Sequence, residues 1–462
     1  MDRSKQLAEE KIGKLLLTFS VPAIVGMLVN ALYNIVDRIF VGRGVGSLAI
    51  AAITIGFPIM IILMAFTMLV GLGATSLISI KLGQDRKDEA EKIMGNSMTL
   101  LVIIMLIMTV SGLIFLEPLL RIFGASADVM PYAKAYLRII LYGAVFQGIG
   151  FGINNIIRAE GNPKIAMLSM LIGAISNTIL DPIFIYGFKM GIEGAAWATI
   201  ISQAASAVWV VSHFISGRSN LKFRKENLRL QGKIIFDIFS IGFAPFMMQL
   251  AASLVTAILN SQLGKFGGDI AISAMGIINS VSTIILMPIF GINQGSQPII
   301  GFNYGAKQYD RVKQTFRYAA TAATILVVIG FFLIRIFPVQ LISLFAQGDQ
   351  TLIDIGTNGI RIFFFAMPII GFQIVSANYF QAVGKPKQAA ILSLSRQVLF
   401  LIPALLILPR FFKLNGIWMA APVADALAFV VTSVWIIFEI KNLGKERDSV
   451  PSSTKPFISG LD

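Results

Sequence analysis

The run LLVIIMLIMTVSGLIFL, residues 100–116, contains no charged residue, and Glu117 is the first charge that follows it. Further uncharged runs occupy residues 319–333 and 398–408. A helix needs about 20 predominantly apolar residues to cross the hydrocarbon core of a bilayer. The strands of a membrane β-barrel would instead alternate apolar and polar residues over about ten positions, and these runs do not alternate. The runs therefore predict membrane-spanning helices.

The composition of the whole chain supports this class. Of the 462 residues, 56% are hydrophobic and 13% are charged, whereas a soluble domain carries about 25% charged residues. The chain has no cysteine, which excludes disulfides and thiolate metal sites, and His213 is its only histidine. The nucleotide-binding pattern GxxxxGK[ST] and the hydrolase patterns HExxH and GxSxG are absent. We therefore expect no enzyme and no cofactor, and any active transport must use an ion gradient or a partner protein.

The apolar runs predict an all-α polytopic protein with twelve spans, and its topology follows from the loops. Of the 38 Lys and Arg residues, 26 lie on the side of the N-terminus, so both termini are predicted to be cytoplasmic in a bacterial-type plasma (inner) membrane. The net charge of +14 then reflects topology, and no nucleic-acid partner is expected. The spans are expected near residues 15–40, 50–80, 92–116, 131–158, 164–188, 192–216, 233–262, 270–300, 312–334, 353–382, 388–410 and 416–440.

An internal repeat organises the chain. Adding 222 or 223 to a residue number in the first half finds a matching residue in the second; Gly161-Asn162-Pro163-Lys164, for example, returns as Gly384-Lys385-Pro386-Lys387. Because six spans are an even number, both halves start on the same membrane face, which predicts two six-helix lobes related by a pseudo-twofold axis along the membrane normal. The predicted divisions are an N-terminal lobe (1–216), a cytoplasmic linker (217–233), a C-terminal lobe (234–441) and a flexible cytoplasmic tail (442–462). Two such lobes are expected to form a central cleft and to rock against each other.

Ionisable residues inside spans are costly and usually functional, which singles out two aspartates in the first half. Asp37 ends a stripe with Asn30 and Asn34 on one helix face, and Asp181 follows Asn177 by one helical turn and precedes a proline. Pro182 is expected to kink the helix and free a carbonyl that could bind a cation. The alternatives are that Asp37 reaches outward to the membrane surface and that Asp181 marks a turn at the end of its span.

Arg396 and Asp425 form a second constellation. Each lies roughly 13 Å into its span, from opposite faces, so both reach a similar depth in a core of about 30 Å. We expect a buried ion pair between the eleventh and twelfth spans, because pairing relieves the cost of two isolated charges. A purely structural role is favoured over a gating role.

The segments Asn30-Ala31-Leu32-Tyr33-Asn34-Ile35-Val36-Asp37 and Asn177-Thr178-Ile179-Leu180-Asp181-Pro182-Ile183-Phe184 resemble the first and fifth spans of multidrug and toxic compound extrusion (MATE) transporters, in their DinF-like branch. The resemblance covers nearly the whole chain. It implies a coupling-ion site for H⁺ or Na⁺ formed by Asp37, Asn177, Asp181 and Thr199. Around that site we expect Tyr33, Asn34, Tyr136 and Asn154.

The resemblance further implies a monomeric antiporter in the lipid bilayer that exports cationic amphipathic drugs in exchange for H⁺ or Na⁺. A related branch also uses acidic residues in the seventh and tenth spans, where this chain has Gln249, Asn260, Gln373 and Asn378. In the repeat, Asp37 maps to Leu259 or Asn260, Asp181 to Pro403 or Ala404, and Thr199 to Ala421 or Pro422, so the ion site is expected in the first lobe alone. The rival interpretations are a lipid-linked oligosaccharide flippase of the same superfamily and, from another class, an intramembrane aspartyl protease.

Overall fold

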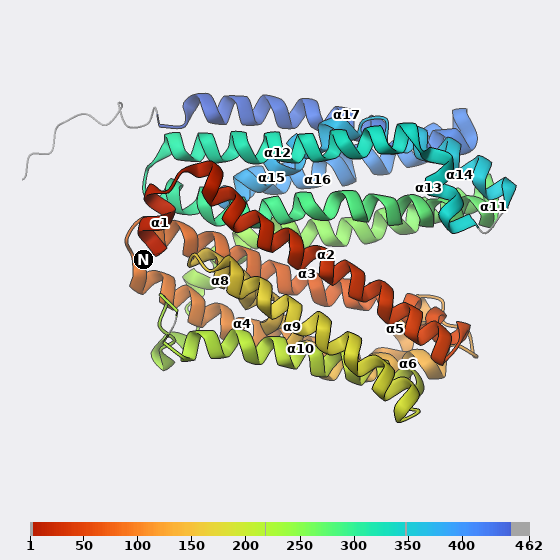
Figure 1. Cartoon of the computed structure of the whole chain (residues 1–462), viewed down its shortest axis with the longest axis horizontal. Coiled ribbons are helices and arrows are strands. Elements are labelled where there is room, and N and C mark those ends of the chain that lie inside the picture. The colour runs from red at the N-terminus through yellow and green to blue at the C-terminus, as the bar shows by residue number, and fades with distance from the viewer. Residues whose placement is uncertain (1–2, 218, 347–348, 445–462) are drawn as a thin grey trace, which may run out of the picture.

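The computed structural model describes residues 3–217, 219–346 and 349–444, and the regular structure within these ranges is helical (Figure 1). The first half, from the short helix α1 to α10, contains α1 (Arg3–Glu9), α2 (Ile12–Gly44), α3 (Ser47–Gly83), α4 (Lys87–Ile114), α5 (Leu116–Ile122), α6 (Met130–Tyr142), α7 (Ala144–Gln147), the π-helix η1 (Gly148–Ile153), α8 (Asn154–Ala159), α9 (Pro163–Pro182), the π-helix η2 (Ile183–Gly187) and α10 (Gly191–Ile215). The predicted tail from 445 onward lies outside the described residues.

A connection with one 3₁₀ turn, η3 (Lys225–Leu228), leads into the second half. That half contains α11 (Gly232–Gly305), α12 (Tyr309–Ile336), α13 (Pro338–Ala346), α14 (Gln350–Phe363), α15 (Met367–Ala382), α16 (Pro386–Leu394), the π-helix η4 (Ser395–Leu401) and α17 (Ile402–Asn442).

These helices provide the twelve predicted spans. In the described part of the chain, nine helical segments are long and apolar enough to cross a membrane, and two helix pairs form bent spans. One of the nine, Pro386–Asn442, has 57 residues and would be about 85 Å long if it were straight, far more than one crossing needs. It breaks at Lys413, where the backbone has φ 51° and ψ −129°, and so supplies two spans.

The repeat is visible in the backbone itself. The bent pair α6 and α7–α8 turns by 55°, and its counterpart, α14 and α15, turns by 53°. Left-handed backbone conformations, which end helices at tight turns, recur 222 or 223 residues apart at Gly46 and Gly268, Asp85 and Lys307, Gly161 and Gly384, and Gly191 and Lys413. The predicted pseudo-twofold architecture is therefore confirmed at the level of individual turns.

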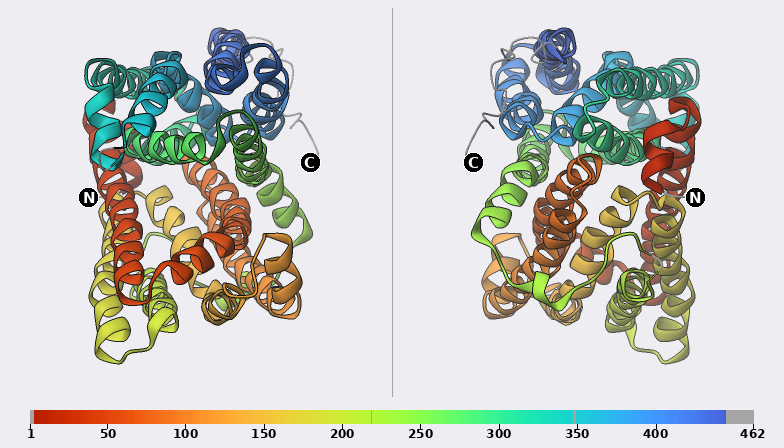
Figure 2. Two further views of the ribbon diagram at one scale, coloured as in Figure 1. Left: turned by 90° about the vertical axis from the view of Figure 1, so that its right-hand side faces the viewer. Right: turned by 90° about the vertical axis from the view of Figure 1, so that its left-hand side faces the viewer.

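The two halves form separate lobes, each with its own apolar core (Figure 2). Two segments cross this division. The beginning of α2, with Leu15 and Phe19, packs into the core of the second lobe, whereas Val41 near its end packs into the first. The beginning of α11, with Ile238, packs into the core of the first lobe. Arg311 of α12 holds the same region by donating to the carbonyls of Leu7, at 3.0 Å, and Glu10, at 2.9 Å. The first span is thus shared between the lobes.

The lobes contact each other in the half of the molecule that carries α1 and the end of α17, called here the terminal half (left in Figure 1). Glycines allow this contact: a Cβ atom on Gly242 would lie 1.7 Å from the Leu69 carbonyl oxygen, and one on Gly83 would lie 1.9 Å from that of Phe302. A side-chain hydrogen bond of 2.9 Å from Gln297 to Ser76 crosses the same interface. The described lobes are therefore closely packed toward the terminal half.

Glu160, in the turn between α8 and α9, fixes the start of the connection between the lobes. This carboxylate is 1% exposed and accepts hydrogen bonds from the Ser219 hydroxyl and, at 3.1 Å, from the Asn220 backbone amide. It also pairs with Nε2 of His213, a residue in the last turn of α10. The single histidine thus serves a structural pair in the terminal half.

Two residues of α4 hold the rest of this connection. Glu91 accepts from the Lys222 backbone amide at 2.9 Å, and its other carboxylate oxygen forms an ion pair with Arg224, with Nε at 3.1 Å. Asn96 donates to the Asn227 carbonyl at 3.1 Å. The connection predicted as a linker is therefore a strap bound along the first lobe from residue 219 to residue 231.

Candidate functional site

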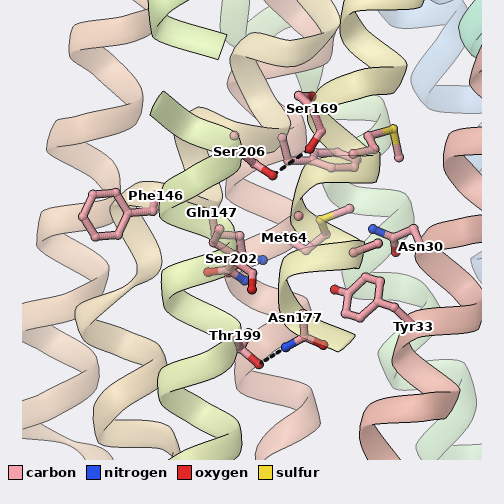
Figure 3. A pocket seen from close by; sticks show the side chains of 16 residues that line it. Asn30, Tyr33, Met64, Phe146, Gln147, Ser169, Asn177, Thr199, Ser202 and Ser206 are labelled. Carbon is pink, nitrogen blue, oxygen red and sulfur yellow. Dashed lines mark hydrogen bonds between the residues drawn. The ribbon is translucent and has the colours of Figure 1, made fainter. Parts of the chain in front are cut away.

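The four residues expected to form an ion site come together inside the first lobe, from three helices. Asp37 comes from α2, Asn177 and Asp181 from α9, and Thr199 from α10, and each side chain is buried. The Asn177 amide donates to Asp181 Oδ1 at 3.3 Å. It also donates to Thr199 Oγ1 at 3.5 Å (Figure 3). The Asp37 and Asp181 carboxyl groups lie close enough to interact with each other.

This arrangement has the chemistry of a cation site. Two carboxyl groups in contact within a buried setting cannot both carry a charge cheaply, so they share a proton or hold a cation between them. The Asn177 carbonyl oxygen is buried and accepts no hydrogen bond from a described residue, which leaves a further oxygen for a cation. No group of three or more His, Cys, Asp or Glu residues suited to a metal occurs among the described residues.

A cavity of about 180 Å³ adjoins these residues and lies within the first lobe (Figure 3). Asn177 and Thr199 form one end of its wall, and Tyr33 and Asn30 of α2 line it as well. The remaining lining residues come from α3, α7, η1, α9 and α10, and are Met64, Phe146, Gln147, Gly150, Phe151, Ser169, Met170, Gly173, Ala174, Ser202, Gln203 and Ser206. The expectation of a cleft between the lobes thus did not locate this cavity, which is lined by α2 and by helices of the first lobe.

The residues expected around the ion site lie in different parts of the first lobe. Tyr33 lines the cavity beside the ion-site residues. Tyr136 is buried in the core of the first lobe, and the side chain of Asn34 lies outside the described set. Asn154 does not join the cluster. Its side chain donates to the Ala166 carbonyl at 2.8 Å and accepts from Arg158 at 2.8 Å. The Asn154 contact on α9 lies about 12 Å or more from Asn177 along the helix axis.

Several lining residues were missed from the sequence. Thr199, Ser202, Gln203 and Ser206 recur at three- and four-residue spacing on α10, which is the pattern of one helix face. That polar face could have been read from the sequence. Gln147 and Met64 carry no comparable pattern.

Arg396 and Asp425 meet in the second lobe. Arg396 Nε lies 2.5 Å from Asp425 Oδ1, and the Asp425 side chain is 2% exposed while that of Arg396 is 30% exposed. The pair joins η4 to the second part of α17, which are the eleventh and twelfth spans. Whether it acts as structural support or in gating stays a prediction.

The second lobe has no copy of the ion site among the described residues. Burial along the chain aligns Asp37 with Leu259, Asn177 with Leu401, Asp181 with Leu405 and Thr199 with Ala421. The sequence register placed Asp181 opposite Pro403 or Ala404; the π-helix η4 inserts one residue and moves the equivalent position to Leu405. All four counterparts are buried apolar residues of the second core.

A membrane protein of twelve spans in two lobes, with buried carboxylates close to a cavity, has the form of a membrane transporter. The model of the MatE family matches residues 22–183 and again residues 245–406, so the two matches begin and end 223 residues apart. The chain belongs to the MATE family of membrane transporters.

Named relatives agree with this assignment. The chain is 26% identical to the multidrug export protein MepA of Staphylococcus haemolyticus, over 94% of this chain and 95% of that protein. Among solved structures, it is similar to the MATE multidrug transporter DinF-BH, solved in complex with a ligand, with 41% identity, a TM-score of 0.89, and coverage of 95% of this chain and 98% of that one. It is also similar to an outward-facing multidrug resistance MATE transporter of the MOP superfamily, with 26% identity, a TM-score of 0.89 and coverage of 95% and 98%.

Proposed function

We propose that the chain exports cationic amphipathic compounds from the cytoplasm, in exchange for H⁺ or Na⁺ that enters through the first lobe. The observation that carries this proposal is the contact between Asp37 and Asp181 beside the first-lobe cavity. The names of the relatives support the cargo class, because MepA is a multidrug export protein and DinF-BH is a multidrug transporter. Both lobes belong to one chain, so a monomer is the proposed transport unit.

The ion and the cargo compete through the charge of the site. When Asp37 and Asp181 carry net negative charge, they attract a cationic compound into the adjoining cavity. When a proton or Na⁺ neutralises them, that attraction is lost and the compound leaves. Ion and cargo therefore favour different occupancy states, and their linkage converts an ion gradient into export.

Alternating access supplies the direction. The predominance of Lys and Arg in loops of the terminal half supports a cytoplasmic location for that half and for both termini. The close contacts between lobes in the terminal half then close the path to the cytoplasm, as expected for an outward-facing state. Rocking of the lobes would open the terminal half for loading.

The proposal is tested with Asp37→Asn and Asp181→Asn in membrane vesicles. Ethidium transport is measured under an imposed pH gradient and, separately, under an imposed Na⁺ gradient, and the effective gradient identifies the ion. Each substitution keeps the side-chain size and removes the ionisable group, so we expect gradient-driven transport to fall to background while the protein still elutes as a folded species. Full ethidium export by both variants would contradict the proposal.

A further inference from the structure

The pattern of buried and exposed residues aligns the two lobes more closely than the sequence does. From α6–α8 to α14–α15 the pattern repeats with an offset of 223, and from α10 to the second part of α17 with an offset of 222. From α9 to α16 the offset is 223 until η4 begins, and it is 224 after η4. Each lining residue outside the stretch opposite η4 therefore has a defined counterpart in the second lobe, and Gly173 lies opposite Arg396 when the offset of 223 is carried into the first turn of η4.

Several of these counterparts are polar or charged, among them Ser393, which aligns with Met170, and three larger residues. Gly150 of η1 aligns with Gln373 of α15, and Gly173 of α9 aligns with Arg396 of η4. The third lining residue, Gln203 of α10, aligns with Asp425. Two positions that are glycine in the first lobe thus carry long side chains, Gln373 and Arg396, in the second. The third position carries Asp425, whose negative charge pairs with Arg396.

We propose that the Arg396–Asp425 pair, together with Gln373, fills in the second lobe the position that the cavity occupies in the first, and so confines cationic cargo to the first lobe. This inference rests on the proposed function, because it takes the first-lobe cavity as the cargo site. It makes the three side chains determinants of where the cargo binds.

The geometry of the pair supports a filling role. Asp425 is 2% exposed and Gln373 is 5% exposed, so neither side chain borders open space. The Gln373 side-chain oxygen accepts no hydrogen bond from a described residue, which is unusual for a buried amide and indicates that it is held there by packing. Arg396 places a fixed positive charge at this position, and its partner neutralises it, so a cation gains no attraction there.

The test copies each lobe into the other and counts ethidium molecules bound to the purified full-length protein. The triple variant Gln373→Gly/Arg396→Gly/Asp425→Gln gives the second lobe the residues of the first. The matched control Arg396→Met/Asp425→Leu removes both charges but keeps the volume. In the other direction, Gly150→Gln fills the first lobe; a Cβ atom at this position meets no atom closer than 3.5 Å outside its own helix, so the change is tolerated by the backbone.

We expect one ethidium per wild-type chain, two per triple variant, one per Met/Leu control and none per Gly150→Gln chain. A folded triple variant that still binds one molecule would overturn the inference. If the triple variant does not fold, Gly150→Gln decides: complete loss of binding supports a closed second lobe, and one retained molecule overturns it. Wild-type protein that binds none would count against the proposed function instead, and the triple variant would then show whether a new site had opened.

Discussion

Asn177 is the residue that joins the parts of the ion site, because one amide nitrogen donates to both Asp181 and Thr199. Its counterpart in the second lobe is Leu401, a residue of similar size that is buried in the core of that lobe. A leucine at position 177 should therefore fit the fold but lack the amide that the ion site needs.

We expect Asn177→Leu to lower gradient-driven ethidium transport at least tenfold and to leave the yield of folded protein unchanged. The loss of a hydrogen bond to a charged group costs about 1.5–3 kcal/mol, which corresponds to about tenfold or more in ion affinity. The control is Thr178→Val, one position along, whose hydroxyl donates to the Ala174 carbonyl of its own helix. Equal transport by wild type and Asn177→Leu would remove Asn177 from the site.

At the residue scale, the sequence singled out the four residues that cluster in the first lobe because carboxylates and amides within apolar spans are conspicuous. The sequence did not predict that Asn154 lies away from this cluster, because a polar residue in a span can form its hydrogen bonds with any nearby backbone, here that of Ala166. It also missed Gln203 and Ser206, whose function comes from the empty space beside them. A cavity depends on packing among several helices and leaves no local pattern.

At the scale of elements, the π-helices lie where the lobes differ. η1 contributes Gly150 and Phe151 to the cavity, η2 directly follows Asp181 and Pro182, and η4 contains Arg396. A π-turn inserts one residue and rotates the side chains that follow it, so it can present a different residue to the interior without changing the length of a span by a full turn. Spans were predictable from hydropathy alone, whereas a one-residue insertion within a helix was not.

The strap between the lobes gives a prediction at the same scale. Replacing both buried carboxylates, in Glu91→Gln/Glu160→Gln, weakens the hydrogen bonds that hold residues 219–224, because a neutral amide accepts less strongly than a carboxylate. We expect trypsin to cut the strap at Arg224 or Lys225 about tenfold faster, since local opening exposes the backbone to the protease.

The rate is measured on purified protein by the appearance of two half-chain fragments. The control is Glu226→Gln, which changes an exposed carboxylate of the same strap and should leave the rate unchanged. A wild-type cleavage rate in the double variant would mean that other contacts, such as those of Asn96, hold the strap on their own.

At the scale of the whole molecule, the structure combines a symmetric frame with an asymmetric interior. Turns, bends and the glycine contacts between lobes repeat. The cluster of Asp37, Asn177, Asp181 and Thr199 does not repeat in the described second lobe, because Leu259, Leu401 and Leu405 make the equivalent region apolar. Under the proposed function, motion involves both lobes and ion coupling the first.

Rigid-body motion can be tested by joining the lobes, and the absence of cysteine in the chain removes any background. In Ser79→Cys/Gly301→Cys, the Cβ atoms would lie 2.8 Å apart across the interface, so a disulfide forms after a shift of about 1 Å. We expect oxidation to abolish ethidium transport and reduction to restore it. A control, Gly95→Cys/Asn227→Cys, has the same 2.8 Å Cβ separation but joins the strap to the first lobe. Because a Cβ atom at Gly95 would also lie 2.4 Å from the Asn227 carbonyl oxygen, the strap must shift as well, and this variant should transport in both redox states. Transport by the oxidised interlobe pair, with the disulfide verified by mass spectrometry, would show that the terminal half need not open and would refute alternating access by rocking of the lobes.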